Sequence, residues 1–287
     1  MTNEQIISKM KKDMKMRNFS HYTYDSYLGK AKVVMRYFKD KEFEEVTTEE
    51  LRRFLLKHLK EEKRLSDRTV NYYNSVIRFM IEVTMDKIIN KKQLPMRKDK
   101  KKVYKVLTKE ELGTFFNACD NFKFKTIFML IYGSGLRIGE VVNLRVEDID
   151  SKNMRLFVRD GKGNKERYTL LPQASLEMLR EYWRKYRQNK RRGRIFLNAK
   201  GEVITQYSIR TQFRKYRRKI KLDEKVTVHT LRHCFATDLI ERGASIIQVK
   251  ELMGHSNIRS TMAYIHVANL KMDIENPLDA FLKKGGK

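Results

Sequence analysis

The spacing of apolar residues changes along this chain, and that change limits the folds open to it. Through the first ~90 residues, apolar side chains recur at three- and four-residue steps, and Gly29 is the only glycine there. Thr47 and Thr48 precede Glu50 and a run of apolar residues at helical spacing, which is typical of an N-cap that leads into an amphipathic helix. We therefore expect residues 1–92 to form a helical bundle.

The segment from Lys91 to Lys105 breaks this pattern. It is dense in lysine, contains a proline and has no room for an apolar face. We interpret residues 93–105 as a basic linker, either a solvated loop or, as we favour, a strap that lies along nucleic-acid phosphates. The lysines expected to bind DNA in such a strap are Lys98, Lys100, Lys101 and Lys102.

The remainder of the chain combines helices with one short strand pattern. Thr108-Lys-Glu-Glu has capping-box chemistry, and residues 124–132 form a further apolar helical stretch. Between Met154 and Leu171 the apolar spacing becomes that of two strands around the turn Gly161-Lys-Gly-Asn, which predicts a β-hairpin. The expected fold class is mainly α with a small antiparallel β-sheet, divided into a helical N-terminal domain and an α+β domain.

A large positive charge restricts the partners of the chain. Lys and Arg number 63 against 35 Asp and Glu, a formal net charge of +28 over 287 residues. Such an excess repels itself unless a polyanion lies nearby, so nucleic acid is the leading partner. A ribosomal or other structural nucleic-acid-binding protein has a similar composition, so charge alone does not identify an enzyme.

Two further features narrow the class of protein. The apolar runs are shorter than the ~20 residues that a membrane-spanning helix needs, and no signal-peptide pattern is visible at the start of the chain. Cys119 and Cys234 are too few for a disulfide framework or a four-cysteine metal site, so we interpret them as buried thiols. We expect a cytoplasmic protein without a membrane partner.

Arg137 and Glu140 belong to the first of two motifs suited to phosphate chemistry. Cleaving a phosphodiester without a metal needs cations around the phosphate, a nucleophile and a proton donor for the departing oxygen. Arginine suits the first task because its planar fork binds two phosphate oxygens and stays charged. In Gly133-Ser-Gly-Leu-Arg-Ile-Gly-Glu, glycines end one helix and Arg137 opens the next. Glu140 lies one turn later, where it could orient an arginine or histidine. The alternative interpretation of this motif is an ordinary corner between two helices, with Arg137 exposed to solvent.

The second motif is His229-Thr-Leu-Arg-His. His229 and Arg232 are three residues apart and share one helical face, so a proton-transfer group and a phosphate clamp can converge there. We expect His233 to point elsewhere. A zinc site is the competing interpretation, but the HExxH arrangement that it would need does not occur, and we expect no metal.

His255 and Tyr264 complete the set of candidates. In Leu252-Met-Gly-His, Gly254 ends an apolar helix and leaves His255 at its terminus, and Tyr264 follows nine residues later. By itself Tyr264 is one of 14 tyrosines and would be assigned to packing. Its interpretation depends on the motifs that precede it.

In this order and at this spacing, the motifs resemble those of the tyrosine recombinases, also called the λ-integrase-type or phage integrase family. The resemblance covers most of residues 105–270 and rests on Gly135-Leu-Arg-Ile-Gly-Glu, Gly161-Lys-Gly-Asn-Lys-Glu-Arg, His229-Thr-Leu-Arg-His, Leu252-Met-Gly-His-Ser and Tyr264. The N-terminal helices and basic linker agree with the layout of the family. The resemblance implies a SAM-like core-binding domain over residues 1–92 and a catalytic domain with a C-terminal tail over residues 106–287.

The resemblance also implies a role for each motif residue. Arg137 and Arg232 would clamp the scissile phosphate. Tyr264 would attack that phosphate to give a 3′-phosphotyrosine and a free 5′-hydroxyl. Lys162 would protonate the leaving 5′-oxygen, and His229 would assist proton transfer at the tyrosine.

Supporting positions follow in the same way. His255 would hydrogen-bond the phosphate, and Glu140 fits a supporting acidic position. Lys165 and Arg167 are candidates for contact with DNA phosphates. Because a phosphotyrosine keeps the energy of the phosphodiester, the resemblance implies that neither ATP nor a metal nor another cofactor is needed.

The implied protein is an Xer-like, two-domain recombinase that acts on double-stranded DNA in a prokaryotic cytoplasm, in association with the nucleoid. It would bind its site as a dimer and form a tetramer in the synapse. Two alternatives stay open: a type IB topoisomerase-like enzyme, which shares the tyrosine chemistry, and a non-catalytic DNA-binding protein such as a repressor. The repressor alternative gives no reason for Lys162, His229, His255 and Tyr264 to occur together.

Overall fold

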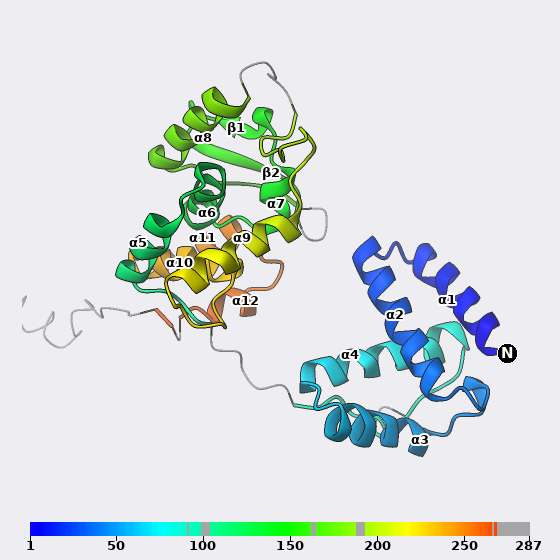
Figure 1. Ribbon diagram of the computed structural model, residues 1–287. Helices are drawn as coiled ribbons and strands as arrows, with labels where there is room; N and C mark the ends of the chain where they lie inside the picture. Colours follow the sequence, from blue (N-terminus) through cyan, green and yellow to red (C-terminus); the bar gives the residue numbers. More distant parts are fainter. Residues whose placement is uncertain (91, 99–103, 162–164, 188–192, 266, 269–287) are drawn as a thin grey trace, which may run out of the picture. The chain divides into compact units, whose positions relative to one another are not determined.

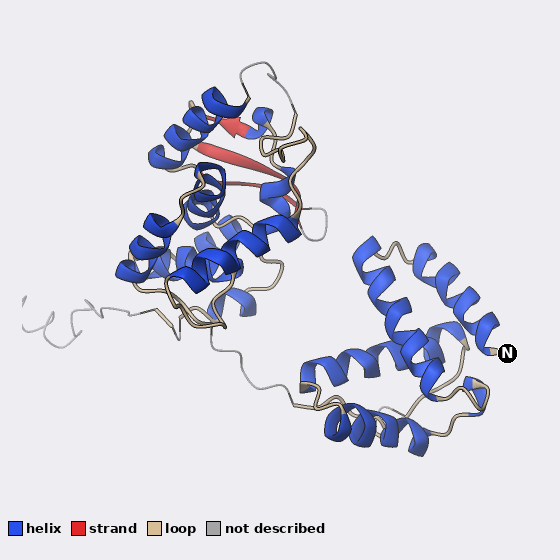
Figure 2. Ribbon diagram, viewed as in Figure 1, coloured by secondary structure: helices blue, strands red, loops and turns tan. Residues whose placement is uncertain are grey.

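The computed structural model describes residues 1–90, 92–98, 104–161, 165–187, 193–265 and 267–268. Contacts within the chain divide it into two units, Met1–Lys101 and Lys102–Lys287. Helices dominate both units, and the strands of the described residues lie in the second (Figures 1 and 2). The predicted fold class, mainly α with a small antiparallel sheet, is confirmed.

The first unit is a helical bundle around one apolar core. Its elements are α1 (Asn3–Met16), α2 (His21–Tyr37), the 3-10 turn η1 (Phe43–Glu45), α3 (Thr48–Arg53) continued by the π-helical η2 (Phe54–Glu62), and α4 (Asp67–Arg78) continued by the π-helical η3 (Phe79–Thr84). Thr47 caps α3 as predicted, because its hydroxyl accepts from the backbone N of Glu50 at 3.3 Å. Met10, Phe54 and Ile77 are fully buried in the core.

Part of the expected linker packs on this first unit. Leu94 is buried in the apolar core, and the side chain of Asn74 donates to its carbonyl at 3.2 Å. Asn71 bonds to the backbone of Arg97 in both directions, at 2.9 and 2.8 Å. Polar side chains of α4 therefore hold the backbone between Leu94 and Arg97. The local sequence pattern does not reveal these contacts.

The second unit surrounds a three-stranded sheet with helices. Its elements are α5 (Lys109–Ala118), α6 (Phe122–Ser134), α7 (Ile138–Asn143), the 3-10 turn η4 (Val146–Asp148), β1 (Ile149–Asp150), β2 (Arg155–Gly161), β3 (Lys165–Leu170), α8 (Gln173–Tyr186), α9 (Gln206–Lys219), α10 (Val228–Glu241), α11 (Ile246–Met253) and α12 (Arg259–Met262). The strands are antiparallel in the order β1-β2-β3. In the register, the buried Leu156 of β2 faces the buried Thr169 of β3. The predicted hairpin is confirmed.

Aromatic packing joins the helices of the second unit. The ring centroid of Phe213 on α9 lies 4.7 Å from that of Phe115 on α5 and 5.4 Å from that of Phe128 on α6, and all three rings are buried. Helix α6 also contacts α8 and α10, while α11 contacts β3. In Figure 1, α8 and the strands lie above α6, and α5 and α10 lie below it.

Replacing Phe213 by Ala should lower the free energy of unfolding of the second unit by about 3–5 kcal/mol, because it removes a buried ring and leaves a cavity. Trp183 is the only tryptophan of the chain and lies in α8, so denaturation followed by its fluorescence reports on this unit. Tyr207→Ala on the same helix is the control, since that side chain is 72% exposed. Equal losses in the two variants would contradict the packing described.

Candidate active site

Arg137 lies at the junction of α6 and α7. Gly135 ends α6 in the left-handed conformation (φ 61°), and a Cβ added there would lie 2.3 Å from the ring of Phe235, so this turn needs glycine. Arg137 donates from Nη1 to Glu140 Oε1 at 2.7 Å and from Nη2 to the carbonyl of Gly254 at 2.9 Å. Its side chain thus links the start of α7 to the end of α11.

Glu140 is a buried anion that holds three arginines. Its carboxylate accepts two hydrogen bonds from Arg167 at 2.9 Å each, and it accepts from Nη1 and the backbone N of Arg137 at 2.7 and 2.8 Å. Nη1 of Arg232 lies 3.7 Å from its Oε2. Burial would raise the pKa of Glu140, but the hydrogen bond from Arg167 and the charges of the three arginines outweigh burial and lower the pKa to about 2. Three guanidinium groups and one carboxylate leave an excess of positive charge, which favours a bound anion.

Arg232 is held mainly by helix ends. Its side chain on α10 is buried and donates to the carbonyls of Gly135 and Met253, at the C-termini of α6 and α11. Carbonyls at helix C-termini carry partial negative charge, so they stabilise a buried cation. Burial and the charge of Arg137 lower the pKa of Arg232 to about 9, which leaves it charged at neutral pH.

His255 follows Gly254, which ends α11 in the left-handed conformation (φ 59°) as predicted. Nδ1 of His255 lies 2.9 Å from the hydroxyl oxygen of the buried Thr261. Burial, followed by the charge of Arg232 and its arginine neighbours, lowers the pKa of His255 to about 4. The imidazole is therefore neutral at neutral pH, with one N–H to donate.

Tyr264 lies just beyond α12 and is 2% exposed. It belongs to an apolar cluster that α10 and α11 share and that includes Phe235. Its hydroxyl oxygen lies 2.9 Å from Nδ1 of His233, and its ring stacks on Tyr104 with centroids 5.0 Å apart. Burial raises the pKa of Tyr264, although the charge of Arg232 opposes this change.

His233 is the functional candidate that sequence reasoning missed. The expectation that it points elsewhere is wrong, because the chain after α11 returns and brings Tyr264 against the side of α10 that carries His233. The two residues are 31 positions apart, so no local spacing indicates their contact. His229 lies one helical turn earlier and is exposed.

These side chains surround one pocket of about 260 Å³. It is lined by Tyr104, Arg137, His229, Arg232, His233, Gly254, His255, Ser256, Ser260 and Tyr264. The structure therefore brings together the two predicted arginines, the two predicted histidines and the predicted tyrosine. Lys162, the sixth predicted catalytic residue, lies outside the described residues.

The other predicted contact residues are placed differently. The side chain of Arg167 is only 9% exposed, and besides Glu140 it binds the carbonyl of Leu252 at 2.8 Å. Arg167 therefore supports the site from within the protein. Lys165 begins β3 opposite Gly161. Lys98 is exposed in the first unit, and Lys100, Lys101 and Lys102 lie outside the described residues.

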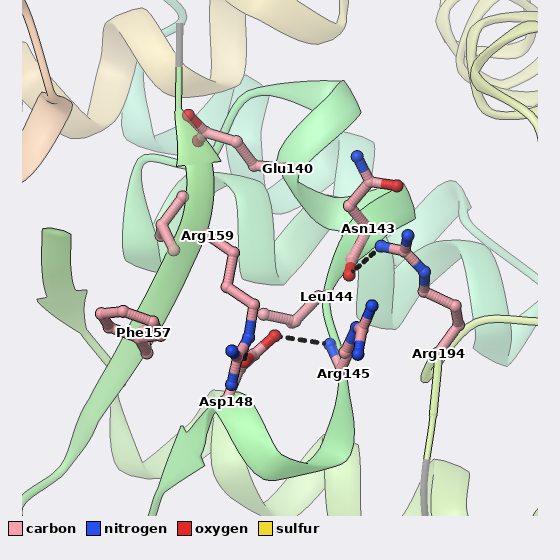
Figure 3. Close-up of a pocket in the computed structure, with 9 residues that line it drawn as sticks. Glu140, Asn143, Leu144, Arg145, Asp148, Phe157, Arg159 and Arg194 are labelled. Carbon is pink, nitrogen blue, oxygen red and sulfur yellow. Dashed lines mark hydrogen bonds and ion pairs between the residues drawn. The ribbon is translucent and has the colours of Figure 1, made fainter. Parts of the chain in front are cut away.

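Glu140 also borders a second pocket of about 30 Å³ (Figure 3). There the buried carboxylate of Asp148 accepts from the backbone N of Arg145 at 2.9 Å and from Nε of Arg159. These contacts shape the turn after α7. The volume is about that of one water molecule, so we assign no substrate to this pocket.

Among the residues that the structure describes, no group of three or more His, Cys, Asp or Glu side chains is arranged to hold a metal ion. No helix in the described part of the chain is long and apolar enough to cross a bilayer.

Replacing Glu140 by Gln should remove an acid-sensitive part of the stability of the second unit. The ordinary pKa of 4.5 falls to about 2 in the folded protein, so this contribution is present above about pH 4.5 and is lost as the pH falls towards 2. We expect Glu140→Gln to cost on the order of 3–5 kcal/mol at pH 7, because it leaves buried arginines uncompensated. The fall in stability between pH 4.5 and 2 should also become shallower.

Denaturation followed by Trp183 fluorescence at several pH values measures both effects. Glu181→Gln is the matched control, because Glu181 is a partly exposed residue of α8 that pairs with Lys185 at the surface. It should change neither the stability at pH 7 nor its acid dependence. Identical pH profiles for Glu140→Gln and the unmodified protein would contradict the role of Glu140.

The sequence matches two related family models. Residues 105–271 match the phage integrase family, and residues 6–91 match the phage integrase N-terminal SAM-like domain. The chain is 32% identical over 274 residues to tyrosine recombinase XerC of Natranaerobius thermophilus, covering 89% of this chain and 91% of that protein. It is 31% identical over 256 residues to tyrosine recombinase XerA of Pyrococcus horikoshii, covering 85% of this chain and 87% of that protein.

Solved structures share the fold. The Tn1549 transposon integrase in complex with transposon right end DNA has a TM-score of 0.72 at 18% identity and covers 99% of both chains. A lambda integrase dimer bound to a COC′ core site has a TM-score of 0.74 at 20% identity, covering 92% of this chain and 95% of that one. A lambda integrase tetramer bound to a Holliday junction has a TM-score of 0.75 at 19% identity, covering 92% and 77%. With the family matches over both units, the chain belongs to the phage integrase family and is a tyrosine recombinase, an enzyme that cleaves and rejoins DNA.

Proposed function

We propose that this recombinase cleaves DNA with Tyr264 and rejoins the strand to a new partner through a 3′-phosphotyrosine. The observation that carries the proposal is that Tyr264, Arg137 and Arg232 line one pocket. A tyrosine hydroxyl beside two positioned guanidinium groups combines a nucleophile with a phosphate-binding site. Strand exchange without ATP or metal follows, because the covalent intermediate keeps the energy of the phosphodiester.

Arg137 and Arg232 bind the scissile phosphate in this proposal. A guanidinium group has five N–H donors. In the described structure, Arg137 uses part of its donors on Glu140 and Gly254, and Arg232 uses part on two helix-end carbonyls. The remaining donors are held in position before DNA binds. Such preorganised cations stabilise the charge that develops on the phosphate oxygens in the transition state.

The histidines and a lysine complete the proposed chemistry. When the hydroxyl of Thr261 donates to Nδ1 of His255, the proton of the neutral imidazole is on Nε2, which can donate to the phosphate. Lys162, in the sequence between β2 and β3, protonates the leaving 5′-oxygen. His229 lines the pocket and assists proton transfer. Glu140 fixes the arginines and does not itself exchange a proton.

We further propose site-specific recombination on double-stranded DNA, with a dimer on each site and a tetramer exchanging strands. The dimer on a core site and the tetramer on a Holliday junction of lambda integrase, which shares the fold, support this assembly. In this proposal residues 1–92 form the core-binding domain and residues 106–287 the catalytic domain. Basic residues, including Lys98, Lys100, Lys101, Lys102 and Lys165, contact DNA phosphates. The enzyme works in a prokaryotic cytoplasm, in association with the nucleoid.

Tyr264→Phe should abolish the covalent protein–DNA adduct on a nicked substrate while DNA binding is kept. Phenylalanine retains the ring that packs on Tyr104 and removes the hydroxyl that attacks. Adducts are counted after denaturing electrophoresis, and binding is measured by mobility shift. Tyr207→Phe, at an exposed position of α9, is the control and should form adducts normally. Undiminished adducts with Tyr264→Phe would remove Tyr264 from the nucleophile role.

Arg137→Ala should slow cleavage of bound DNA by roughly 100- to 1,000-fold, the usual loss when one transition-state donor is removed. Single-turnover cleavage at saturating enzyme measures the rate apart from binding. Arg145→Ala is the control, since Arg145 lies just beyond the other end of α7, outside the 260 Å³ pocket. Equal effects of the two substitutions would argue against a phosphate clamp at Arg137.

A further inference from the structure

His233 lies against the proposed nucleophile, although the resemblance assigns it no role. It is neither the first histidine of the His229-Thr-Leu-Arg-His motif nor the histidine that follows α11. Its side chain nevertheless makes the hydrogen bond to the hydroxyl of Tyr264, with Nδ1 and the hydroxyl oxygen 2.9 Å apart. His233 also lines the pocket that contains Arg137 and Arg232.

We infer that His233 is the group that accepts the proton of Tyr264 directly during cleavage and returns it during rejoining, while His229 assists from the same pocket. This inference rests on the proposal that Tyr264 is the nucleophile. In the reacting tautomer, Nε2 of His233 carries the ring proton and Nδ1 accepts from the tyrosine hydroxyl. The distance of 2.9 Å is within the reach that direct proton transfer requires.

The environment of Tyr264 explains why an acceptor is needed. The side chain is 2% exposed, and burial raises the pKa of its hydroxyl, so the phenolate does not form spontaneously at neutral pH. Arg232 and Arg137 favour the phenolate but do not overcome burial. A hydrogen-bonded base makes a free phenolate unnecessary, because the base takes up the hydroxyl proton of Tyr264 while the tyrosine oxygen attacks phosphorus.

His255, whose ring also lies near that of Tyr264, is less suited to this task. The ring centroid of His255 lies 6.2 Å from that of Tyr264, and Nδ1 of His255 is engaged with Thr261. Burial, followed by the charges of the arginines around it, disfavours protonation of His255, as its lowered pKa shows. His255 is therefore a donor to the phosphate, whereas His233 faces the nucleophile.

Tyr104 fixes the geometry of this pair. Its ring lies over His233 with centroids 4.2 Å apart and over Tyr264 with centroids 5.0 Å apart. One aromatic side chain thus packs on both partners of the hydrogen bond. This packing limits the rotation of the two rings and keeps Nδ1 directed at the hydroxyl.

In cleavage, each bond that breaks is matched by a bond that forms. The O–H bond of Tyr264 breaks, and its proton forms an N–H bond at Nδ1 of His233. The tyrosine oxygen forms a bond to phosphorus while the bond from phosphorus to the 5′-oxygen breaks, and the 5′-oxygen takes a proton from the general acid. In rejoining, the 5′-hydroxyl attacks phosphorus, the general acid recovers its proton, and the His233 imidazolium returns a proton to Tyr264.

The test uses the 287-residue chain and single-turnover cleavage of a bound, nicked DNA. His233→Asn places an amide oxygen near the position of Nδ1, so it can accept a hydrogen bond but cannot take up the proton. We expect roughly 100- to 10,000-fold slower adduct formation, the usual range for a lost general base. His21→Asn, the same substitution at an exposed histidine of α2, should leave the rate unchanged. Adduct formation by His233→Asn at the unmodified rate would overturn the inference.

A second measurement separates proton acceptance from a purely structural role. Fluorinated tyrosine at position 264 has a more acidic hydroxyl and depends less on a base. The defect of His233→Asn should therefore shrink in this background, and added imidazole should partly restore His233→Ala. A defect that persists undiminished in both experiments would show that His233 only supports packing, and would overturn the inference. Trp183 fluorescence and DNA binding verify that the variants are folded.

The outcome for His233 is distinguishable from that for the proposed function. If Tyr264→Phe still forms adducts, the nucleophile assignment fails. If Tyr264→Phe forms none while His233→Asn cleaves at the unmodified rate, the nucleophile assignment stands and the proton acceptor is another group.

Discussion

The buried carboxylate of Glu140 is the interaction on which the rest of the site depends. Positive side chains that converge on a phosphate repel one another before the phosphate arrives, and burying them adds a desolvation cost. Glu140 offsets both effects by pairing with Arg137 and Arg167 and lying close to Arg232. Because one anion serves three cations, an excess of positive charge stays available for the proposed binding of a DNA phosphate.

Helix ends supply the second part of this arrangement. Gly135 and Gly254 end α6 and α11 in the left-handed conformation, and their neighbourhood exposes carbonyls that accept from Arg232 and Arg137. These two turns meet beside α10, so the arginines are fixed by backbone groups that cannot move independently of the core. A Cβ at Gly254 would lie 2.9 Å from the side chain of Arg167. The ion pair between Arg167 and Glu140 therefore depends on the close packing of the turn at Gly254.

The tyrosine is placed by apolar packing rather than by charge. Tyr264 is seated against α10 and α11 in the cluster that contains Phe235, and Tyr104 covers its ring. Burial gives the hydroxyl a fixed position at the pocket but also makes it a weaker acid. As the proposed nucleophile, a tyrosine held in this way needs a neighbouring base, and His233, the proposed acceptor, lies within hydrogen-bonding distance of its hydroxyl.

The sequence by itself determined the helices, the hairpin and the identity of five of the ten residues that line the pocket. Helical spacing, the caps at Thr47 and Thr108 and the strand pattern around Gly161 are local signals, and local backbone physics is sufficient to read them. The motifs containing Arg137, Arg232 and His255 could be found because each stands in a distinctive short context, whereas Tyr264 could be found only from its position nine residues after His255.

Only the tertiary structure decided which side chains meet. Arg167 stands in a basic turn motif that suggests contact with DNA, yet it turns inward to Glu140 across 27 residues of chain. His233 meets Tyr264 across 31 residues of chain. Likewise, the side chains of Asn71 and Asn74 bind backbone groups of the expected linker that lie more than 15 residues away in the sequence. Such contacts depend on how helices pack, and packing is set by the whole core rather than by the spacing of neighbouring residues.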